Sequence, residues 1–226
     1  MAVLNTVQNT VGATVAQLQK PENRKLLVII AGCLVVLGLC WWGYSWYSAQ
    51  KEKAAQQAFA DCVQEYEQAQ AGQVQWPKVE QLSKLSYDNH SGSNMAPYFL
   101  ALQAEALLKQ QKADEAIVVL DKVVSVMPSG SPVYALHATK RALVKLDRTE
   151  EAMHAAGLQE LTTLAYDQNN NNRDMALYYL GLYHWIHNDL DKAKKEWFEL
   201  LNLQKKEEGS PSPWAVLAQD KLRNIQ

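Results

Sequence analysis

The feature that most constrains the fold is a helical pattern that occurs three times from Tyr98 onward. The first copy, "YFLALQAEALLKQQKADEAI", begins at Tyr98, and the second, "YALHATKRALVKLDRTEEAM", begins at Tyr134. The third, "LYYLGLYHWIHNDLDKAKKEWFELL", begins at Leu177. Each copy has a helix with an apolar stripe, a short polar turn, an acidic residue, an alanine and a second helix. Such units bury a continuous core only by stacking on one another, so the sequence predicts an all-α solenoid.

The third copy resembles a tetratricopeptide repeat. Its spacing, L-x2-LG-x2-H…A-x3-W, follows the pattern of that family from Leu177 to Trp197. The resemblance implies small residues where the two helices of a pair approach closely, because a larger side chain would push them apart. With copies one and two aligned at the 36-residue spacing of Tyr98 and Tyr134, we expect these repeat-packing residues: Ala104, Ala116, Ala152, Gly181, Ala193 and Trp197. Lys140 stands where the other copies have a small residue, so the second pair is expected to pack differently.

The first helix of each pair would line the concave side of a repeat superhelix. Helical spacing gives these candidates for partner binding on that face: Tyr98, Tyr134, His137, Arg141, Tyr178 and Trp185, with Ala101, Glu105, Leu108, Val144 and Leu182 beside them. Aromatic side chains with a few polar groups suit the capture of an extended or helical peptide. For each aromatic residue, packing against the neighbouring helix is the alternative interpretation.

An uncharged run from Leu26 to Tyr47 lies before the repeats. As a helix it would cover roughly 33 Å, and the core of a bilayer is about 30 Å thick. Its last third holds the aromatic residues typical of a membrane interface: Trp41, Trp42, Tyr44, Trp46 and Tyr47. A cleaved signal peptide would have a shorter apolar core and a small-residue cleavage site. Lipidation of Cys33, in "IAGC", is the sharper alternative, but the resulting N-terminus would be more hydrophobic than an ordinary tether.

Basic residues flank the run unequally, with Lys20, Arg24 and Lys25 before it and Lys51 and Lys53 after it. This bias favours a cytoplasmic N-terminus. We therefore predict a short cytoplasmic tail over residues 1–25, a single transmembrane helix over 26–47 and a periplasmic tetratricopeptide-like helical domain over 48–226, in a bacterial inner membrane.

Just after the run, a helical stalk is expected with an apolar stripe that includes Phe59, Cys62 and Tyr66. The role of residues 1–19, which carry a stripe of valines, stays open.

Composition and motifs argue against nucleic-acid binding, enzyme activity and a metal site. The net charge is −2, and since residues 1–25 carry +2 the remainder carries −4, which argues against a nucleic-acid partner. The sequence has no phosphate loop, nucleophile elbow or zinc-protease helix. His184 and His187 lie three residues apart on one expected helix, but no cysteine or further histidine supports them as a metal pair. We expect no enzyme activity, metal or cofactor, and an enzyme with an unrecognised site is the alternative.

The plan of the chain is similar to the bacterial ancillary subunit of the Sec translocon, the YfgM-like family. The likeness is carried by the tail ending in "ENRK", one anchor, an Ala/Gln-rich stalk, degenerate repeats and the final helix "PWAVLAQDKLRNI". It implies a scaffold or chaperone assistant in the inner membrane whose partners are translocon subunits, a periplasmic peptidyl-prolyl isomerase chaperone and emerging client proteins. The alternatives are an envelope scaffold for cell division, secretion or outer-membrane assembly, and an organelle-anchored repeat protein of a eukaryote.

Overall fold

The computed structural model describes the backbone of residues 21–206 and 211–225, and the side chains of residues 32–225 except 132 and 205–210. The predictions for residues 1–20 lie outside the described residues. The chain divides into two compact units, residues 1–54 and 55–226. Over the described residues every regular element is a helix, as predicted: α2 (Pro21–Gln70), α3 (Trp76–His90), α4 (Ala96–Lys109), α5 (Ala113–Val126), α6 (Pro132–Leu146), α7 (Glu151–Tyr166), α8 (Arg173–Ile186), α9 (Leu190–Lys206) and α10 (Pro213–Arg223).

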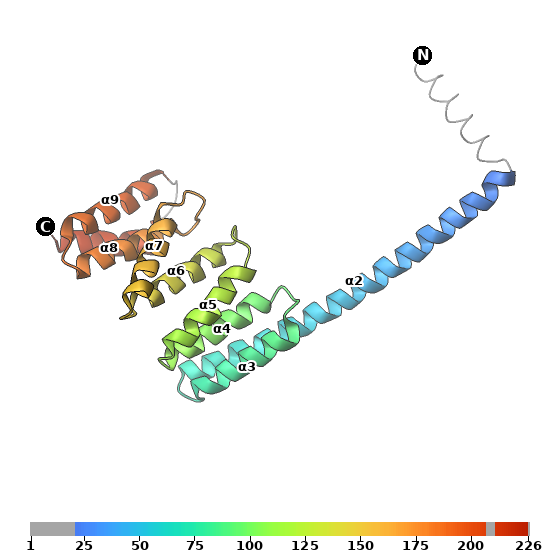
Figure 1. Cartoon of the computed structure of the whole chain (residues 1–226), viewed down its shortest axis with the longest axis horizontal. Helices are drawn as coiled ribbons and strands as arrows, with labels where there is room; N and C mark the ends of the chain where they lie inside the picture. The colour runs from blue at the N-terminus through green and yellow to red at the C-terminus, as the bar shows by residue number, and fades with distance from the viewer. Residues whose placement is uncertain (1–20, 207–210, 226) are drawn as a thin grey trace, which may run out of the picture. The chain divides into compact units, whose positions relative to one another are not determined.

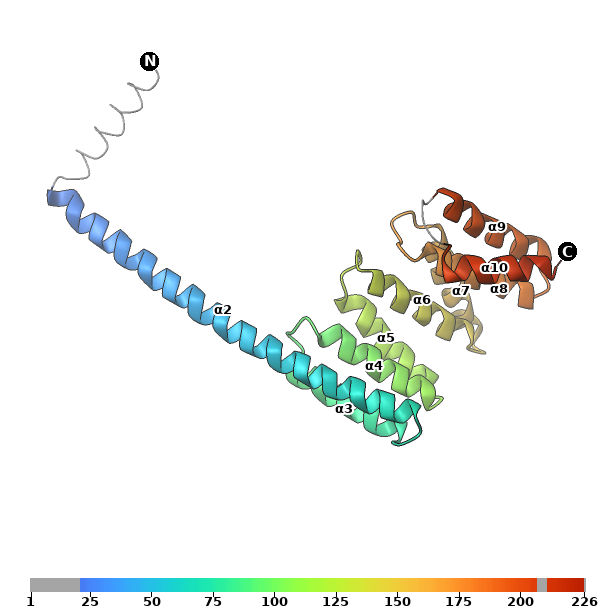
Figure 2. The same cartoon turned by 180° about the vertical axis from the view of Figure 1, so that it is seen from behind.

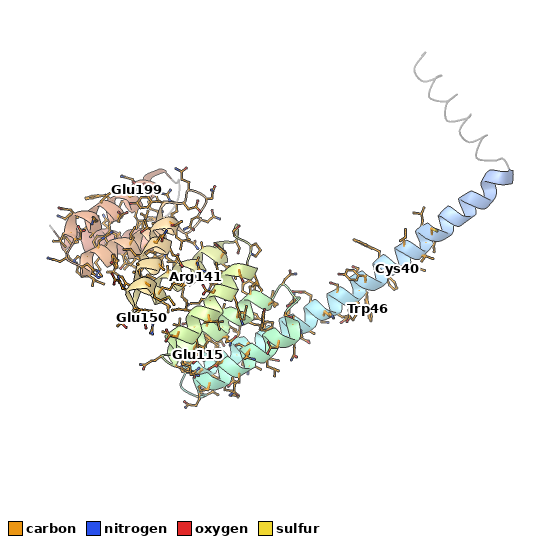
Figure 3. The ribbon with its side chains drawn as sticks, viewed as in Figure 1. Cys40, Trp46, Glu115, Arg141, Glu150 and Glu199 are labelled. Carbon is orange, nitrogen blue, oxygen red and sulfur yellow. The ribbon has the colours of Figure 1, made fainter. Side chains whose placement is uncertain are left out.

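The first unit contains the N-terminal part of α2. Its large apolar side chains are exposed from Leu34 to Tyr47, and Trp41 is 76% exposed. The thiols of Cys33 and Cys40 are free and exposed; Cys40 and Trp46 are labelled in Figure 3. At the end of the aromatic segment, the ammonium group of Lys51 lies 4.7 Å from the centre of the Tyr47 ring. Among the described residues, no helix has both the length and the mean hydropathy needed to cross a membrane.

The second unit is a series of antiparallel helix pairs, α4 with α5, α6 with α7 and α8 with α9 (Figure 1). Each helix from α3 to α9 packs against the next, and α10 packs against both α8 and α9 (Figure 2). Proline in the first turn begins α4, α6 and α10, where its missing N–H costs no hydrogen bond. The Ser131 and Ser212 hydroxyls accept backbone N–H groups at the starts of α6 and α10. The predicted solenoid and its closing C-terminal helix are thus confirmed.

Close packing of the third pair centres on Gly181 and Trp197. A Cβ atom at Gly181 would lie 2.4 Å from Nε1 of Trp197, so the absence of a side chain makes room for the indole ring. Trp197 is fully buried, and its Nε1 donates a hydrogen bond to the backbone carbonyl of Tyr178 at 3.1 Å. Ala193 is also fully buried in the same cluster. In the first pair, Ala104 and Ala116 are likewise fully buried in one cluster.

The second pair departs from the sequence alignment. Residues 110–112 and 187–189 join the first and third pairs, and each turn has one residue in the left-handed region, Gln111 (φ 62°) and Asn188 (φ 60°). Residues 147–150 join the second pair, one residue more, and every non-glycine φ in that turn is negative. The longer turn shifts the register, so Ala152 is exposed and is not the packing residue.

The close approach in this pair instead falls on Ala142 and Gly157. Ala142 is fully buried, and a Cβ atom at Gly157 would lie 2.7 Å from the carbonyl oxygen of Ala142. The pair therefore packs closely despite Lys140, because the small residue of α6 lies two positions later than the alignment placed it.

Candidate functional site

A groove of about 310 Å³ lies on the first helices of copies one and two and on the C-terminal part of α2, within the second unit. Four of its residues were predicted from helical spacing as inward-facing, namely Tyr98, Ala101, Glu105 and His137. The structure brings these together and adds four more: Phe59, Tyr66, Leu102 and Lys140. The groove therefore combines α4 and α6 with the stalk helix, and it is the candidate partner-binding site.

Aromatic side chains form much of the groove wall. The ring centres of Phe59 and Tyr98 are 5.9 Å apart in an edge-to-face arrangement, and Phe59 makes the same kind of contact with buried Phe99. Tyr66 packs edge-on against Trp76 at 5.5 Å. Edge-to-face pairs hold rings in defined orientations, so the wall is a preformed apolar surface.

His137 is the buried polar residue of the groove. Its side chain is 8% exposed, and its Nδ1 atom is buried without a hydrogen-bond partner. Burial lowers the pKa of His137 to about 4, with a further contribution from the positive charge of Lys140, while Glu105 acts in the opposite direction. The imidazole is therefore neutral at neutral pH. One ring nitrogen can still take a partner that the folded chain does not supply.

Two charged groups lie beside this histidine and neutralise each other. The Lys140 ammonium group donates to the carboxylate of Glu105 at 2.5 Å, which joins α6 to α4. Both side chains are partly exposed, 35% for Lys140 and 22% for Glu105. The groove thus presents polar groups without a net charge.

Arg141, another predicted binding residue, lies in a different setting. Its guanidinium group donates to Glu160 of α7 at 3.0 Å and to Asp121 of α5 at 3.1 Å. Lys145, one helical turn later, contacts the same two carboxylates at 2.6 and 3.7 Å. Arg141, labelled in Figure 3, therefore ties α6 to both neighbouring second helices, and it does not line the groove.

The remaining predicted binding residues are also separate from the groove. Tyr134 lines a polar hollow with Ser131 and the loop residues Asn169–Asn171. Tyr178 is 8% exposed and packs against Trp214 of α10 at 5.5 Å between ring centres. Trp185 is partly covered by α10, whose Lys221 ammonium group lies 4.0 Å from its ring centre. The closing helix thus occupies part of the face on which these two aromatic residues were expected to bind a partner.

Two of the four groove residues that the binding prediction missed, Phe59 and Tyr66, come from outside the repeats. Phe59 and Tyr66 belong to the apolar stripe expected on the stalk, seven residues apart and so on one helix face. That stripe was expected to pack, and nothing in the sequence pairs it with Tyr98. The Lys140 ammonium group could have been linked to Glu105 only by knowing that α4 and α6 lie side by side.

The two histidines of α8 and its C-terminal turn, His184 and His187, were the candidate metal pair. Among the residues that the structure describes, no group of three or more His, Cys, Asp or Glu side chains could hold a metal ion. Nδ1 of His187 lies 2.8 Å from the carbonyl oxygen of Tyr183, its own helix neighbour. Burial lowers the pKa of His184. His187 therefore has a partner within its own helix, and burial favours the neutral form of His184.

Comparison with solved structures finds tetratricopeptide-repeat proteins. One is a tetratricopeptide repeat protein from Parabacteroides merdae, with a TM-score of 0.51 and 18% identity over 75% of this chain. This chain spans 60% of that protein's length. Two others are structures of a Podosopora anserina putative kinesin light chain with nearly identical TPR-like repeats, with TM-scores of 0.54 and 0.53, 14% identity, and coverage of 75% of this chain and 84% of theirs. No family model and no curated protein matches the chain. At these identities the likeness establishes the fold alone, a tetratricopeptide-like solenoid.

Proposed function

We propose that the chain is a single-pass inner-membrane protein whose periplasmic repeat domain acts as a protein-interaction scaffold and chaperone assistant beside the Sec translocon. The observation that carries the proposal is the groove on a tetratricopeptide-like domain that directly follows an uncharged, aromatic-ended segment. The function consists of binding, and no catalytic step is assigned to any residue.

The anchor is supported by the whole uncharged run, residues 26–47, of which the structure describes side chains only from residue 32. Exposed tryptophan and tyrosine rings are costly in water, and Trp41, Trp42 and Tyr44 are each at least 70% exposed. At a bilayer interface the same rings would lie in a favourable environment. A basic N-terminal flank supports a cytoplasmic N-terminus.

Anchoring would raise the local concentration of the groove near the membrane. Tyr47 and Phe59 are twelve positions apart in the sequence, and chain length alone limits the distance between them to about 43 Å. A tethered site needs only weak contacts to engage proteins that emerge nearby, because tethering converts their encounter into a local one. This favours a scaffold or chaperone assistant over a freely diffusing binder.

The Sec translocon and a periplasmic peptidyl-prolyl isomerase chaperone are proposed as partners from the resemblance in overall plan. The experiment is site-specific photo-crosslinking in native membranes with a photoreactive amino acid at Leu102, which lines the groove. The matched control carries the same group at Val118, which is 58% exposed on α5. Mass spectrometry should identify translocon subunits, the chaperone or emerging clients at Leu102 and not at Val118. Cell-division or outer-membrane assembly proteins at Leu102 would instead support the alternative envelope scaffold.

Topology is tested separately, by adding protease to spheroplasts. The repeat domain should be digested while the N-terminal tail is protected. A repeat domain that stays intact until the membrane is lysed would overturn the proposed orientation and the periplasmic function.

A further inference from the structure

We propose that the groove formed by α2, α4 and α6 binds a short, uncharged and apolar stretch of extended or unfolded polypeptide. The inference rests on the proposed scaffold function and names its substrate class. Three features of the groove carry it: charge compensation, apolar walls and a buried polar atom without a partner.

Charge compensation excludes a strongly charged occupant. Lys140 and Glu105 are the two formally charged side chains of the lining, and they pair at 2.5 Å. A basic segment would have to displace Lys140 from the carboxylate, and an acidic segment would have to displace Glu105 from the ammonium group. In both cases an existing ion pair would be exchanged for a new one, so a charged segment gains little from its charge. An uncharged segment leaves the pair intact.

The walls supply the apolar contact. Phe59, Tyr66, Tyr98 and Leu102 line the groove from two helices. The volume of about 310 Å³ lies at the lower end of the range of about 300–1,000 Å³ for pockets that bind small ligands. A few side chains of an extended segment fit such a space, whereas a folded surface does not.

The unpartnered Nδ1 of His137 favours polypeptide over a purely apolar molecule. A buried polar atom without a hydrogen bond is destabilising, and a bound group that pairs with it recovers that loss. Peptide groups provide both a donor and an acceptor at every residue other than proline. This histidine, whose pKa burial lowers to about 4, is neutral at neutral pH and so adds no net charge to the groove.

A different hollow from the one that Tyr134 lines provides a contrast. Its lining consists almost entirely of polar and charged side chains, among them Gln168, Asn171, Arg173 and Asp174. That hollow offers little apolar surface to a non-native segment. That hollow therefore does not share the apolar character on which the proposed specificity of the groove rests.

The experiment uses the purified full chain and three photoreactive peptides that differ only at their centre. One has an uninterrupted core of Leu, Val and Phe, and the other two carry a central Lys or a central Asp. Saturable crosslinking at fixed detergent concentration gives apparent affinities, and the crosslinked residues are mapped by mass spectrometry. The apolar peptide should crosslink to the groove at least tenfold more tightly than either charged peptide.

Introducing a negative or a positive charge at one groove position tests whether the apolar peptide binds there. Ala101→Glu and Ala101→Lys should both weaken the apolar peptide at least tenfold, while Ala155→Glu, on an exposed site of α7, should change it less than twofold. If the apolar peptide binds both Ala101 variants as tightly as it binds the wild type, it does not occupy the groove and the proposal is wrong.

A second variant guards against misfolding of the Ala101 variants. Lys140 is partly exposed, so Lys140→Gln should fold normally and leave Glu105 unpaired in the groove. The apolar peptide should then bind at least threefold more weakly and the Lys-containing peptide more tightly; unchanged preferences would overturn the role of the charge pair.

The outcomes separate this proposal from the scaffold function. If the apolar peptide does not bind while photoreactive Leu102 still captures envelope proteins, the substrate class is wrong and the scaffold function stands. Crosslinks from Leu102 to a second copy of the chain would identify the groove as a self-association surface and overturn the proposal. Loss of both peptide binding and partner capture would overturn both.

Discussion

Replacing Gly181 by alanine should destabilise the repeat domain, although alanine is the better helix former. An exposed helix interior would gain about 1 kcal/mol from the change. At Gly181 the added Cβ atom would lie 2.4 Å from Nε1, 2.7 Å from Cδ1 and 2.8 Å from Cε2 of Trp197. Carbon atoms pack best at about 3.5–4.0 Å, so the indole ring or the helix must move by about 1 Å.

Two costs follow from that movement. Overpacking a buried site typically costs about 1–3 kcal/mol, and Trp197 is fully buried. Moving the ring also weakens the hydrogen bond from Nε1 to the Tyr178 carbonyl, and an unpaired buried donor costs about 1–3 kcal/mol. After subtracting the gain in helix propensity, we expect a net loss of about 3 kcal/mol, within about 1–5 kcal/mol.

The assay is urea unfolding of the full chain followed by circular dichroism at 222 nm. Gly92→Ala is the matched control, because nothing lies within 4 Å of a Cβ atom there and its φ is not in the left-handed region. A double-mutant cycle with Trp197→Phe sharpens the test, since the three nearest atoms all belong to the five-membered ring that phenylalanine lacks. Gly181→Ala should cost less in the Trp197→Phe background by about 1–3 kcal/mol. If Gly181→Ala is as stable as the wild type, or if its cost is the same in both backgrounds, the close packing of the third pair is misread.

The remaining predictions concern stability and can share that assay. His137 should make the domain acid-sensitive: its folded pKa of about 4 lies below the unfolded value of about 6.5, so stability present above pH 6.5 is lost as the pH falls toward 4, by about 3 kcal/mol at most. His137→Gln should remove that part of the pH dependence, and an unchanged profile would contradict it. Ala142→Leu should lower the free energy of unfolding by about 1–3 kcal/mol, because Ala142 is fully buried. Ala152→Leu should change it by no more than about 0.5 kcal/mol, because Ala152 is exposed. If Ala152→Leu has the larger effect, Ala152 is the packing residue, as the 36-residue alignment predicted. Tyr178→Ala should lower the free energy of unfolding by about 3–5 kcal/mol as a core truncation, and Trp185→Ala by about 1 kcal/mol. A loss at Trp185 as large as that at Tyr178 would show that both residues belong to the core.

Helix periodicity was sufficient to predict the all-α solenoid, because apolar stripes at helical spacing leave each pair with a face that only a neighbouring pair can bury. The same reasoning placed Ala104, Gly181 and Trp197 at helix contacts, and the structure buries all three residues. Their burial follows from local spacing within one pair, which a sequence records directly.

The candidate site was predicted only in part. Spacing along α4 and α6 identified Tyr98 and His137, which do line the groove. It also selected Arg141, because the helical period cannot distinguish a side chain that faces a partner from one that faces Asp121 and Glu160 on neighbouring helices. These ion pairs join residues 19 and 20 positions apart, and their geometry depends on how the pairs stack. Long-range pairing of this kind has no local pattern.

The second copy shows how one residue in a turn can mislead an alignment. In copies one and three, Ala116 and Ala193 are each the fourth residue of their helix, after Ala113 and Leu190. The fourth residue of α7 is His154, not alanine, and its Nδ1 lies 2.7 Å from the carbonyl oxygen of Leu146 at the end of α6.

That hydrogen bond changes what the position does. An alanine there allows two helices to approach, whereas His154 satisfies a carbonyl group that the end of α6 leaves without a helical partner. Its Nε2 also lies 3.2 Å from the hydroxyl of Tyr183 on α8, so the side chain links the second pair to the third. With the tight contact moved to Ala142 and Gly157, the longer turn exchanges a packing residue for a polar connection between repeats. The departure from the repeat pattern therefore creates a contact between the second and third pairs, which an alignment at a constant period does not reveal.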